Sequence, residues 1–367
     1  MNVIFDIAVI GGGIMGCGAA LRLSEGGMSA VVLEQSDIGQ GASGVNAGTL
    51  SMQIKRVKLM SYAIKGHEMW EEMGDRIGFH RTGGYTLAFS DKEADLLHER
   101  MTMKKEAGAN IEFVSPDKVI SSEPHLTKKI IAASYCPDDG YANSSLTGHY
   151  YRSRLKEHDV SYMEKFGVTD ILEHEDGWKI FSGTKVVVAK RILLAAGGWC
   201  KKLAGMVGVD LPIRARINTV SVTERAPLLF SSILGHATGL LTMKQKENGT
   251  ILIGGGWQGK GTPEQGRGQI DIKNLIANLQ LAKFVIPDLA NIRVVRSWTG
   301  FEANVPDFYP LAGKLANMDN AFILACVRGG YTIGPYISKL MGDFILGKET
   351  EMPLFDPSRD IIEGRLI

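Results

Sequence analysis

The chain has 367 residues, of which 44% are hydrophobic, and its 41 basic and 40 acidic side chains leave a formal net charge of +1. This length exceeds what one hydrophobic core usually serves, which predicts two lobes, and the near-neutral charge gives no field that would attract nucleic acid or an anionic membrane. No apolar run reaches the roughly twenty residues of a membrane span, and the first residues lack the basic segment and cleavage site of a secretory signal, so we expect a cytoplasmic location.

The first forty residues predict a strand, a helix and a second strand. The apolar run from Phe5 to Ile10 is typical of a buried parallel strand, and Ile14 to Glu25 has the apolar spacing of a helix. Ser29 to Leu33 is a second apolar run, and it ends at Glu34. This order indicates a βαβ unit.

The rest of the chain alternates helical and strand-like patterns after a glycine- and serine-rich loop at 39–48. We expect helices at 57–73, 92–106, 146–157, 272–284 and 335–346. Strand-like runs are found at 85–89, 167–172, 178–182, 185–188, 191–198 and 321–327. Elements of the kind that bind cofactors occur at the start, middle and end, so we expect the two lobes to be interleaved along the chain.

The turn between the first strand and helix reads Gly11-x-Gly13-x-x-Gly16. Gly11 allows a tight turn, Gly13 lets the backbone approach a pyrophosphate, and Gly16 lets the helix pack closely on the sheet. The phosphates of a dinucleotide would lie at the helix N-terminus, and Glu34 can accept hydrogen bonds from ribose hydroxyls. Because strand, helix and acidic residue are all in place, the pattern indicates a dinucleotide cofactor.

The segment after this unit favours FAD over a nicotinamide cofactor. A nicotinamide enzyme usually completes its sheet with a second, contiguous half, whereas here the chain continues into the small residues of Gly41 to Gly48. Such a loop can thread past a flat ring. The alternative is a flexible surface loop.

The cysteines give no indication of a metal site. They lie far apart and form no C-x-x-C pair, so neither zinc nor an iron–sulfur cluster is expected. We expect buried free thiols and no metal. The four are Cys17, Cys136, Cys200 and Cys326.

These motifs resemble those of the D-amino-acid oxidase superfamily of FAD enzymes, in the branch of glycine oxidase, sarcosine oxidase and D-amino-acid dehydrogenase. The chain is more specifically similar to the β subunits of heteromeric opine, hydroxyproline or proline dehydrogenases and hydrogen cyanide synthase. The resemblance covers essentially the whole chain and also rests on 194–199, 306–313 and 330–335. It implies an α/β fold with a Rossmann-type FAD-binding domain (1–80, 145–215 and 310–367) interleaved with an antiparallel-sheet substrate domain (81–144 and 216–309).

The resemblance also implies which residues contact FAD. The small-residue loop would line the isoalloxazine or the pyrophosphate, the backbone of residue 168 would meet the adenine, and the turn at 330–333 would place a helix N-terminus near the flavin pyrimidine, where reduced flavin carries negative charge. No cysteine matches an attachment site, so FAD is expected to be non-covalent. The expected contacts are Gly11, Gly13, Ile14, Met15, Gly16, Glu34, Gln35, Ser43, Asn46, Ala47, Gly48, Val168, Ala196, Gly197, Arg328, Gly330, Tyr331, Thr332 and Ile333.

Two positions depart from the family pattern. The family commonly has Gly-His-Gly where this chain has Arg328-Gly329-Gly330, and Arg328 either supplies positive charge near the flavin or is a surface arginine. Glu302 stands where the amino-acid oxidases usually have the arginine that binds the substrate carboxylate. A carboxylate there would repel that group, so either Glu302 pairs with a cationic group of the substrate, or the substrate is oriented differently, or Glu302 belongs to a structural ion pair.

The resemblance implies oxidation of the C–N bond of a small amino acid, imino acid or opine by hydride transfer to flavin N5. Glu302, Tyr331 and Trp298 are the candidate residues of the substrate pocket. The likeness to β subunits implies a dehydrogenase that works with partner subunits carrying further redox centres. The alternatives are a flavin-dependent 2-hydroxy-acid oxidase or dehydrogenase, and a FAD-binding subunit without catalysis of its own.

Overall fold

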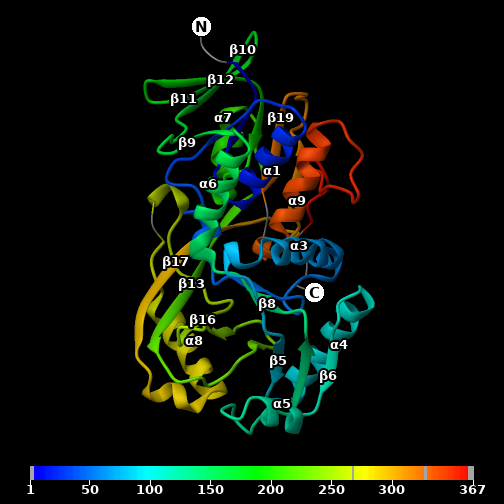
Figure 1. The fold of residues 1–367 in the computed structure, drawn as a ribbon, viewed down its shortest axis with the longest axis vertical. Coiled ribbons are helices and arrows are strands. Elements are labelled where there is room, and N and C mark those ends of the chain that lie inside the picture. Colours follow the sequence, from blue (N-terminus) through cyan, green and yellow to red (C-terminus); the bar gives the residue numbers. More distant parts are fainter. Residues whose placement is uncertain (1–3, 267, 326–328, 363–367) are drawn as a thin grey trace. The chain divides into compact units, whose positions relative to one another are not determined.

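The computed structural model describes residues 4–266, 268–325 and 329–362. Contacts within the chain divide it into two units. The first comprises Met1–Gly44, Ser145–Arg216 and Phe301–Leu366, and the second consists mainly of Val45–Ser144 and Ile217–Gly300. Figure 1 shows the fold coloured along the sequence, with the blue N-terminal helix α1 beside the orange helix α9 near the C-terminus.

The first unit is built on a sheet of eight strands. Its central strands are parallel and almost fully buried, which accounts for their continuous apolar sequences. The hairpins β10–β11–β12 and β18–β19 are antiparallel. The strand order is β10 (Asp170–His174), β11 (Gly177–Ser182), β12 (Lys185–Leu194), β1 (Ile4–Ile10), β2 (Ala30–Leu33) and β9 (Ser161–Met163), and β12 also pairs with β19 (Ala321–Ala325), which pairs with β18 (Leu311–Lys314).

Helices α1 and α9 pack side by side in this unit and run parallel. Gly334 faces Ile14, and Gly18 faces Ser338 so closely that a Cβ on Gly18 would overlap the serine side chain. Residues 14 and 18 of α1 thus face residues 334 and 338 of α9, so the two helices run in the same direction and their N-termini lie at the same end of the pair. The helices of the unit are α1 (Ile14–Glu25), α6 (Thr147–Glu157), α7 (Cys200–Met206) and α9 (Gly330–Ile345), and α2 (Ala42–Val45) spans the boundary at residue 44.

The second unit contains a sheet of eight strands and a smaller one of three. The pairings described in the large sheet are antiparallel except that β14 runs parallel to β5. The large sheet has the order β17 (Val294–Asn304), β13 (Arg214–Arg225), β16 (Thr250–Gly254), β15 (Thr242–Gln245), β14 (Ile233–His236), β5 (Gly84–Ala88), β7 (Ala132–Cys136) and β6 (Glu112–Val114), and the small sheet has β3 (Thr49–Leu50), β8 (Gly140–Tyr141) and β4 (His80–Arg81). Its helices are α3 (Met60–Met73), α4 (Asp91–Glu106), α5 (Pro116–Ser122) and α8 (Ile272–Val285).

The mixed α/β architecture agrees with the expected fold class, but the units have different boundaries from the expected domains. Residues 45–80, expected in the FAD-binding part, belong to the second unit because β3 and β4 both pair with β8. Residues 301–309, expected in the substrate part, belong to the first unit because Ala303 and Val305 are buried in its apolar core.

Several local predictions differ from the structure. The run expected at 167–172 is a strand at Asp170–His174, and the two runs at 185–188 and 191–198 form one strand, β12, which ends at Leu194. The expected loop at 39–48 contains the one-turn helix α2. Helix α9 begins at Gly330 rather than at Pro335, because Gly329 adopts the left-handed conformation (φ 85°) and turns the chain into the helix earlier.

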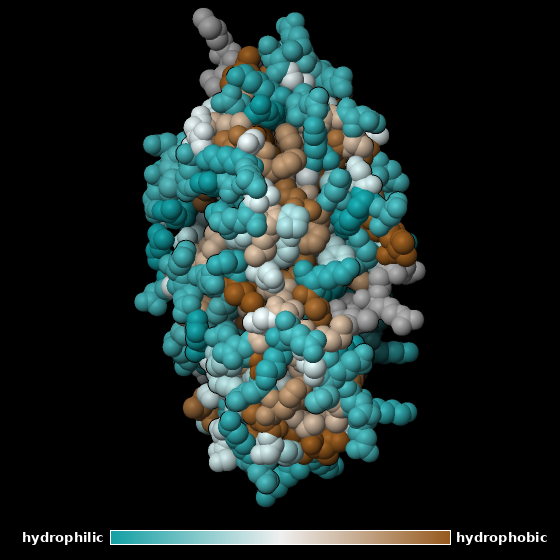
Figure 2. Space-filling view, turned by 90° about the vertical axis from the view of Figure 1, so that its right-hand side faces the viewer, coloured by the Kyte–Doolittle hydropathy of each residue, from teal (hydrophilic) through white to brown (hydrophobic). Residues whose placement is uncertain are grey.

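The surface carries no helix that could span a membrane. None of the helices in the described ranges is long and apolar enough to do so. Figure 2 shows one face of the molecule, on which hydrophobic residues form separate areas among hydrophilic ones.

Candidate functional site

The glycine turn after β1 is pressed against the backbone at the end of β12. Gly11 has φ +121°, and a Cβ there would lie 2.5 Å from the carbonyl oxygen of Ala195. A Cβ on Gly16 would overlap the carbonyl oxygen of Gly11. Glycine is therefore required at both positions, as the sequence pattern predicted.

The first turn of α1 is left without a side-chain cap. Its N-cap residue, Gly13, has no side chain that could accept a hydrogen bond, and the first amide bonded inside the helix is that of Cys17, which donates to the Gly13 carbonyl at 2.9 Å. The Ile14 amide donates to Ser43 Oγ at 3.0 Å. The amides of Met15 and Gly16 have no acceptor within the helix, so this helix start can bind an anion.

Glu34 is fixed at the end of β2 beside this turn. Its Oε2 accepts from the Gly12 amide at 2.7 Å and its Oε1 accepts from the Ser36 amide at 2.8 Å. Burial raises the pKa of the Glu34 carboxyl, against the two backbone hydrogen bonds, which lower it. Two backbone amides thus hold the carboxyl group beside the glycine turn, and Gln35 follows directly.

Two further backbone segments lie in the first unit. Ala196 and Gly197 follow β12 at its carboxyl end, the edge at which parallel sheets bind ligands. Gly197 has φ +55° and open space where a Cβ would project. Val168 and Ala196 pack partly buried against the apolar core of the unit.

The start of α9 carries two of the candidate pocket residues. Glu302 Oε1 accepts a hydrogen bond from the amide of Gly329, the N-cap residue of α9, at 3.1 Å. The hydroxyl of Tyr331 lies 3.1 Å from Thr147 Oγ1, and burial raises the pKa of that tyrosine. Arg328 lies outside the described residues.

The loop after α2, in the second unit, is held by hydrogen bonds on both sides. Asn46 Oδ1 accepts from the Gly48 amide at 2.6 Å, and the Asn46 carbonyl accepts from Ser144 Oγ at 2.8 Å. The Gly48 carbonyl accepts from the Ala142 amide at 2.9 Å. Trp298 Nε1 donates to the Val45 carbonyl at 2.7 Å. The loop, which includes Ala47, is therefore a fixed element rather than a flexible surface loop.

The candidate residues thus divide between the two units. The structure gathers the glycine turn, Glu34, Ser43 and the start of α9 in the first unit, and Asn46, Gly48 and Trp298 in the second.

The residues of the first unit fit an FAD molecule. Gly11 and Gly16 admit no Cβ, and the start of α1 keeps amides without intrahelical acceptors. Thr332, in the first turn of α9, is fully buried, and its Oγ1 has no hydrogen-bond acceptor or donor within the described residues. Gly330 and Ile333 belong to the same turn. Because α1 and α9 are parallel, their N-termini lie at one end, where a long dinucleotide can reach both.

The model of the DAO family, described as FAD dependent oxidoreductase, matches residues 6–344. The chain belongs to this family. This DAO-family chain is accordingly an FAD-dependent oxidoreductase, and the expected cofactor is confirmed.

Relatives of this DAO-family chain match it along most of its length. An opine oxidase subunit of Rhizobium meliloti is 26% identical over 341 residues, covering 88% of this chain and 89% of the relative. The crystal structure of glycine oxidase from Geobacillus kaustophilus has a TM-score of 0.89 at 23% identity and covers 97% of this chain and 99% of that one. L-proline dehydrogenase from P. horikoshii has a TM-score of 0.88 at 21% identity and covers 97% and 98%. The two solved structures confirm the fold.

Several residues around the site were not found from the sequence. Ala142, Ser144 and Thr147 hold candidate residues through hydrogen bonds, but they lie about a hundred or more positions away in the chain. Lys244 is 2% exposed although its strand reads as an ordinary half-buried one. In the sequence Lys244 alternates with Met243 and Gln245, and this pattern usually places a lysine in solvent, so it did not predict the burial of Lys244.

Proposed function

We propose that the chain oxidises the C–N bond of a small amino acid, imino acid or opine. The observation that carries the cofactor part of the proposal is the pair of parallel helix starts, α1 and α9, at the carboxyl edge of one sheet, with Glu34 fixed beside them. Family membership establishes the FAD chemistry. The substrate class is supported by relatives named for opine and glycine oxidation.

In this proposal the glycine turn, Ser43, Glu34 and Gln35 hold the adenosine and pyrophosphate parts of FAD, together with Val168, Ala196 and Gly197. Asn46 to Gly48 and the turn Gly330 to Ile333 hold the flavin. We propose that FAD is held without a covalent bond. In support, burial raises the pKa of the thiols of Cys17, Cys136 and Cys200, the cysteines within the described residues. Such thiols stay protonated and are poor nucleophiles.

Bound FAD supplies a hydride acceptor for the substrate carbon. The chain's own residues would hold the substrate carbon in place and exclude water. Tyr331 and Trp298 are the proposed substrate contacts of the first and the second unit. The Tyr331 hydroxyl bonds Thr147, and Trp298 Nε1 donates to the Val45 carbonyl. Glu302, held at the start of α9 by the Gly329 amide, would face a cationic group of the substrate.

We further propose that the chain is a dehydrogenase that passes electrons to partner subunits. Support comes from the similarity to a protein named as one subunit of an opine oxidase. Rapid formation of hydrogen peroxide by the isolated chain, with substrate and oxygen alone, would contradict this part of the proposal.

An anaerobic absorbance titration of the FAD-loaded chain tests the reaction. The ligands are D- and L-amino acids, N-alkyl amino acids, opines and the matching 2-hydroxy acids. Loss of the visible flavin band with one class of amine supports the proposal. Bleaching by 2-hydroxy acids alone indicates C–O oxidation, and no bleaching by any ligand, with or without co-purified subunits, indicates a FAD-binding subunit without catalysis.

A further inference from the structure

Lys244 is a buried amine in the second unit. Only 2% of the residue is exposed, and its Nζ donates to Thr49 Oγ1 at 2.6 Å. The same nitrogen lies 6.0 Å from the ring centroid of Tyr141. Within the described ranges of the chain, no carboxylate forms an ion pair with it.

The direction of the side chain follows from the register of β15. Met243 belongs to the apolar core of the second unit, and the side chain of Gln245 accepts from the Leu229 amide. Lys244 therefore lies on the opposite face of the strand. Lys246, two residues further along, donates from Nζ to Asn143 Oδ1 at 3.2 Å.

Both lysines face the segment that braces the proposed flavin loop. Thr49 follows Gly48 directly, and the Ala142 amide, between Tyr141 and Asn143, donates to the Gly48 carbonyl. A chargeable amine and a hydroxyl thus stand together at the end of this loop.

A buried ammonium group without an anion is costly, so such a group either loses its proton or binds an anion. Burial, and to a smaller extent the neighbouring Lys246, lower the pKa of Lys244 to about 7. Thr49 accepts from Lys244 and keeps its own hydroxyl proton, which can be donated to an anionic oxygen. The pair therefore offers two donors to one carboxylate.

We propose that Lys244 and Thr49 bind the carboxylate of the amine substrate. The inference rests on the proposed function for the identity of the ligand. Lys244 would supply the cation that binds the substrate carboxylate. The amino-acid oxidases usually have an arginine for this role, at the position where this chain has Glu302. The anion could instead be the reduced flavin, and the experiment separates the two sources.

The test measures propionate binding to the FAD-loaded full chain by calorimetry, with the flavin oxidised and no turnover. Propionamide, which has the same size and no charge, is the matched ligand. At pH 6 wild type is expected to bind propionate but not propionamide. Lys244→Met is expected to weaken propionate binding about ten- to hundredfold, the range for a charge-assisted hydrogen bond.

Lys246→Met is the matched control, because it removes a lysine two residues away on the same face. Propionate affinity should be retained or become tighter in this variant, since Lys246 lowers the pKa of Lys244. An equal FAD content and an unchanged melting temperature in both variants exclude a folding defect.

The pH dependence gives a second readout. Propionate affinity of wild type should fall about tenfold per unit above pH 7 as the amine loses its proton, and Lys244→Met should abolish that fall. The other titratable groups facing this place are Lys246, Tyr141 and, beyond Tyr141, the pair His80 and Glu247, at 3.4 Å. Lys246→Met should keep the fall in affinity, which separates the two lysines.

Three results would overturn the inference: wild type that does not bind propionate at pH 6, Lys244→Met that binds it normally, or Lys244→Met that changes only the flavin midpoint potential. The last result would assign the amine to the flavin ring. Because no substrate is turned over, these outcomes are separate from the bleaching titration that tests the proposed function.

Discussion

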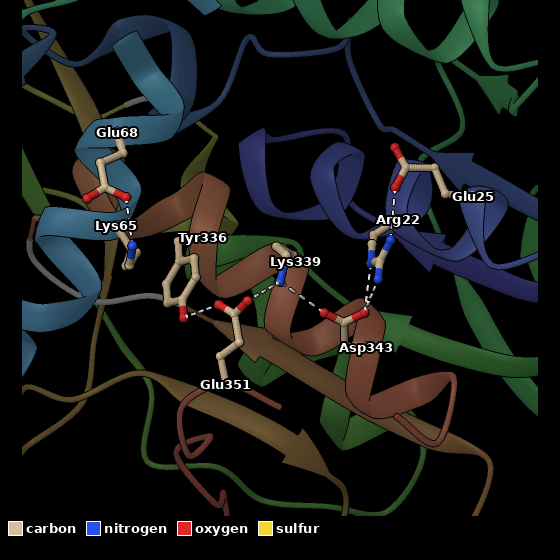
Figure 3. A network of polar contacts seen from close by, with 8 residues as sticks. All are labelled: Arg22, Glu25, Lys65, Glu68, Tyr336, Lys339, Asp343 and Glu351. Atoms are coloured by element: carbon tan, nitrogen blue, oxygen red, sulfur yellow. Dashed lines mark hydrogen bonds and ion pairs between the residues drawn. The ribbon is translucent and has the colours of Figure 1, made fainter. Parts of the chain in front are cut away.

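Replacement of Asp343 by alanine is expected to destabilise the first unit by about 2–3 kcal/mol. Figure 3 shows the polar network that joins α1, α9 and the segment after α9. Asp343 Oδ1 accepts from Arg22 Nε at 2.7 Å and lies 2.6 Å from Arg22 Nη2, and its Oδ2 lies 3.4 Å from Lys339 Nζ. Lys339 also pairs with Glu351, which accepts from the Tyr336 hydroxyl at 2.9 Å.

The magnitude follows from the burial of the pair. Removing one member of a fully buried ion pair typically costs about 3–5 kcal/mol because the other charge is left uncompensated. The Asp343 side chain is 7% exposed, whereas that of Arg22 is 27% exposed and can regain part of its hydration. Arg22 also keeps Glu25 at 3.2 Å. The expected loss is therefore below the fully buried range.

Urea unfolding of the FAD-loaded chain, followed by flavin fluorescence and circular dichroism, measures this loss. Glu25→Ala is the matched control, because Glu25 bonds the same arginine but is 42% exposed, and exposed pairs contribute about 0–1 kcal/mol. Equal unfolding midpoints for Asp343→Ala and Glu25→Ala would refute the reasoning. Weaker FAD binding by Asp343→Ala alone would further show that the network aligns the two helix starts.

Three other perturbations follow from the site. Gly16→Ala is expected to abolish FAD retention during purification, because its Cβ would overlap the Gly11 carbonyl; a fully flavinylated variant would contradict this. Glu302→Gln keeps a hydrogen-bond acceptor at the start of α9 but removes a negative charge. The flavin midpoint potential should therefore rise by about 10–40 mV in a dye-coupled titration, and a fall in the potential would count against placing α9 at the flavin. Burial lowers the pKa of Lys104 to about 7, below its unfolded value, so the free energy of unfolding should rise with pH between about 7 and 10; Lys104→Met should flatten that rise in urea midpoints.

The sequence predicted the parts of the fold that local pattern determines. Ile14–Glu25 is the helix that was expected, residue for residue, because a glycine turn precedes it and glycines end it. The start of α9 was predicted at Pro335, because proline usually lies in the first turn of a helix. In the structure Pro335 lies inside the helix, which begins at Gly330. Residues 45–80 were expected in the FAD-binding lobe, whereas their contacts group them with the second unit, where β3 and β4 pair with β8. These two strands are two residues long, too short to leave a pattern in the sequence.

The sequence indicated candidate residues for the site but not the interactions that hold them. The sequence indicated Glu302, but its hydrogen bond to Gly329 depends on how β17 meets the start of α9. Lys244 alternates with Met243 and Gln245 as a surface lysine would, and only the pairing of β3 with β8 shows that a second layer covers it. Burial of that kind is a property of tertiary contacts, which a single sequence does not encode locally.

The parallel packing of α1 on α9 has a consequence for synthesis of the protein. Residues 14–22 of α1 contact partners at 334–342 of α9. Helix α1, which follows the glycine turn, can therefore pack on α9 only after residues 334–342 have left the ribosome. Strand β19, which completes the sheet beside β12, is also made late. Contacts of such long sequence separation form slowly, and until then the glycine face of α1 is exposed. FAD is therefore expected to load only after the residues of α9 have been made, and a nascent chain stopped before residue 330 should bind none.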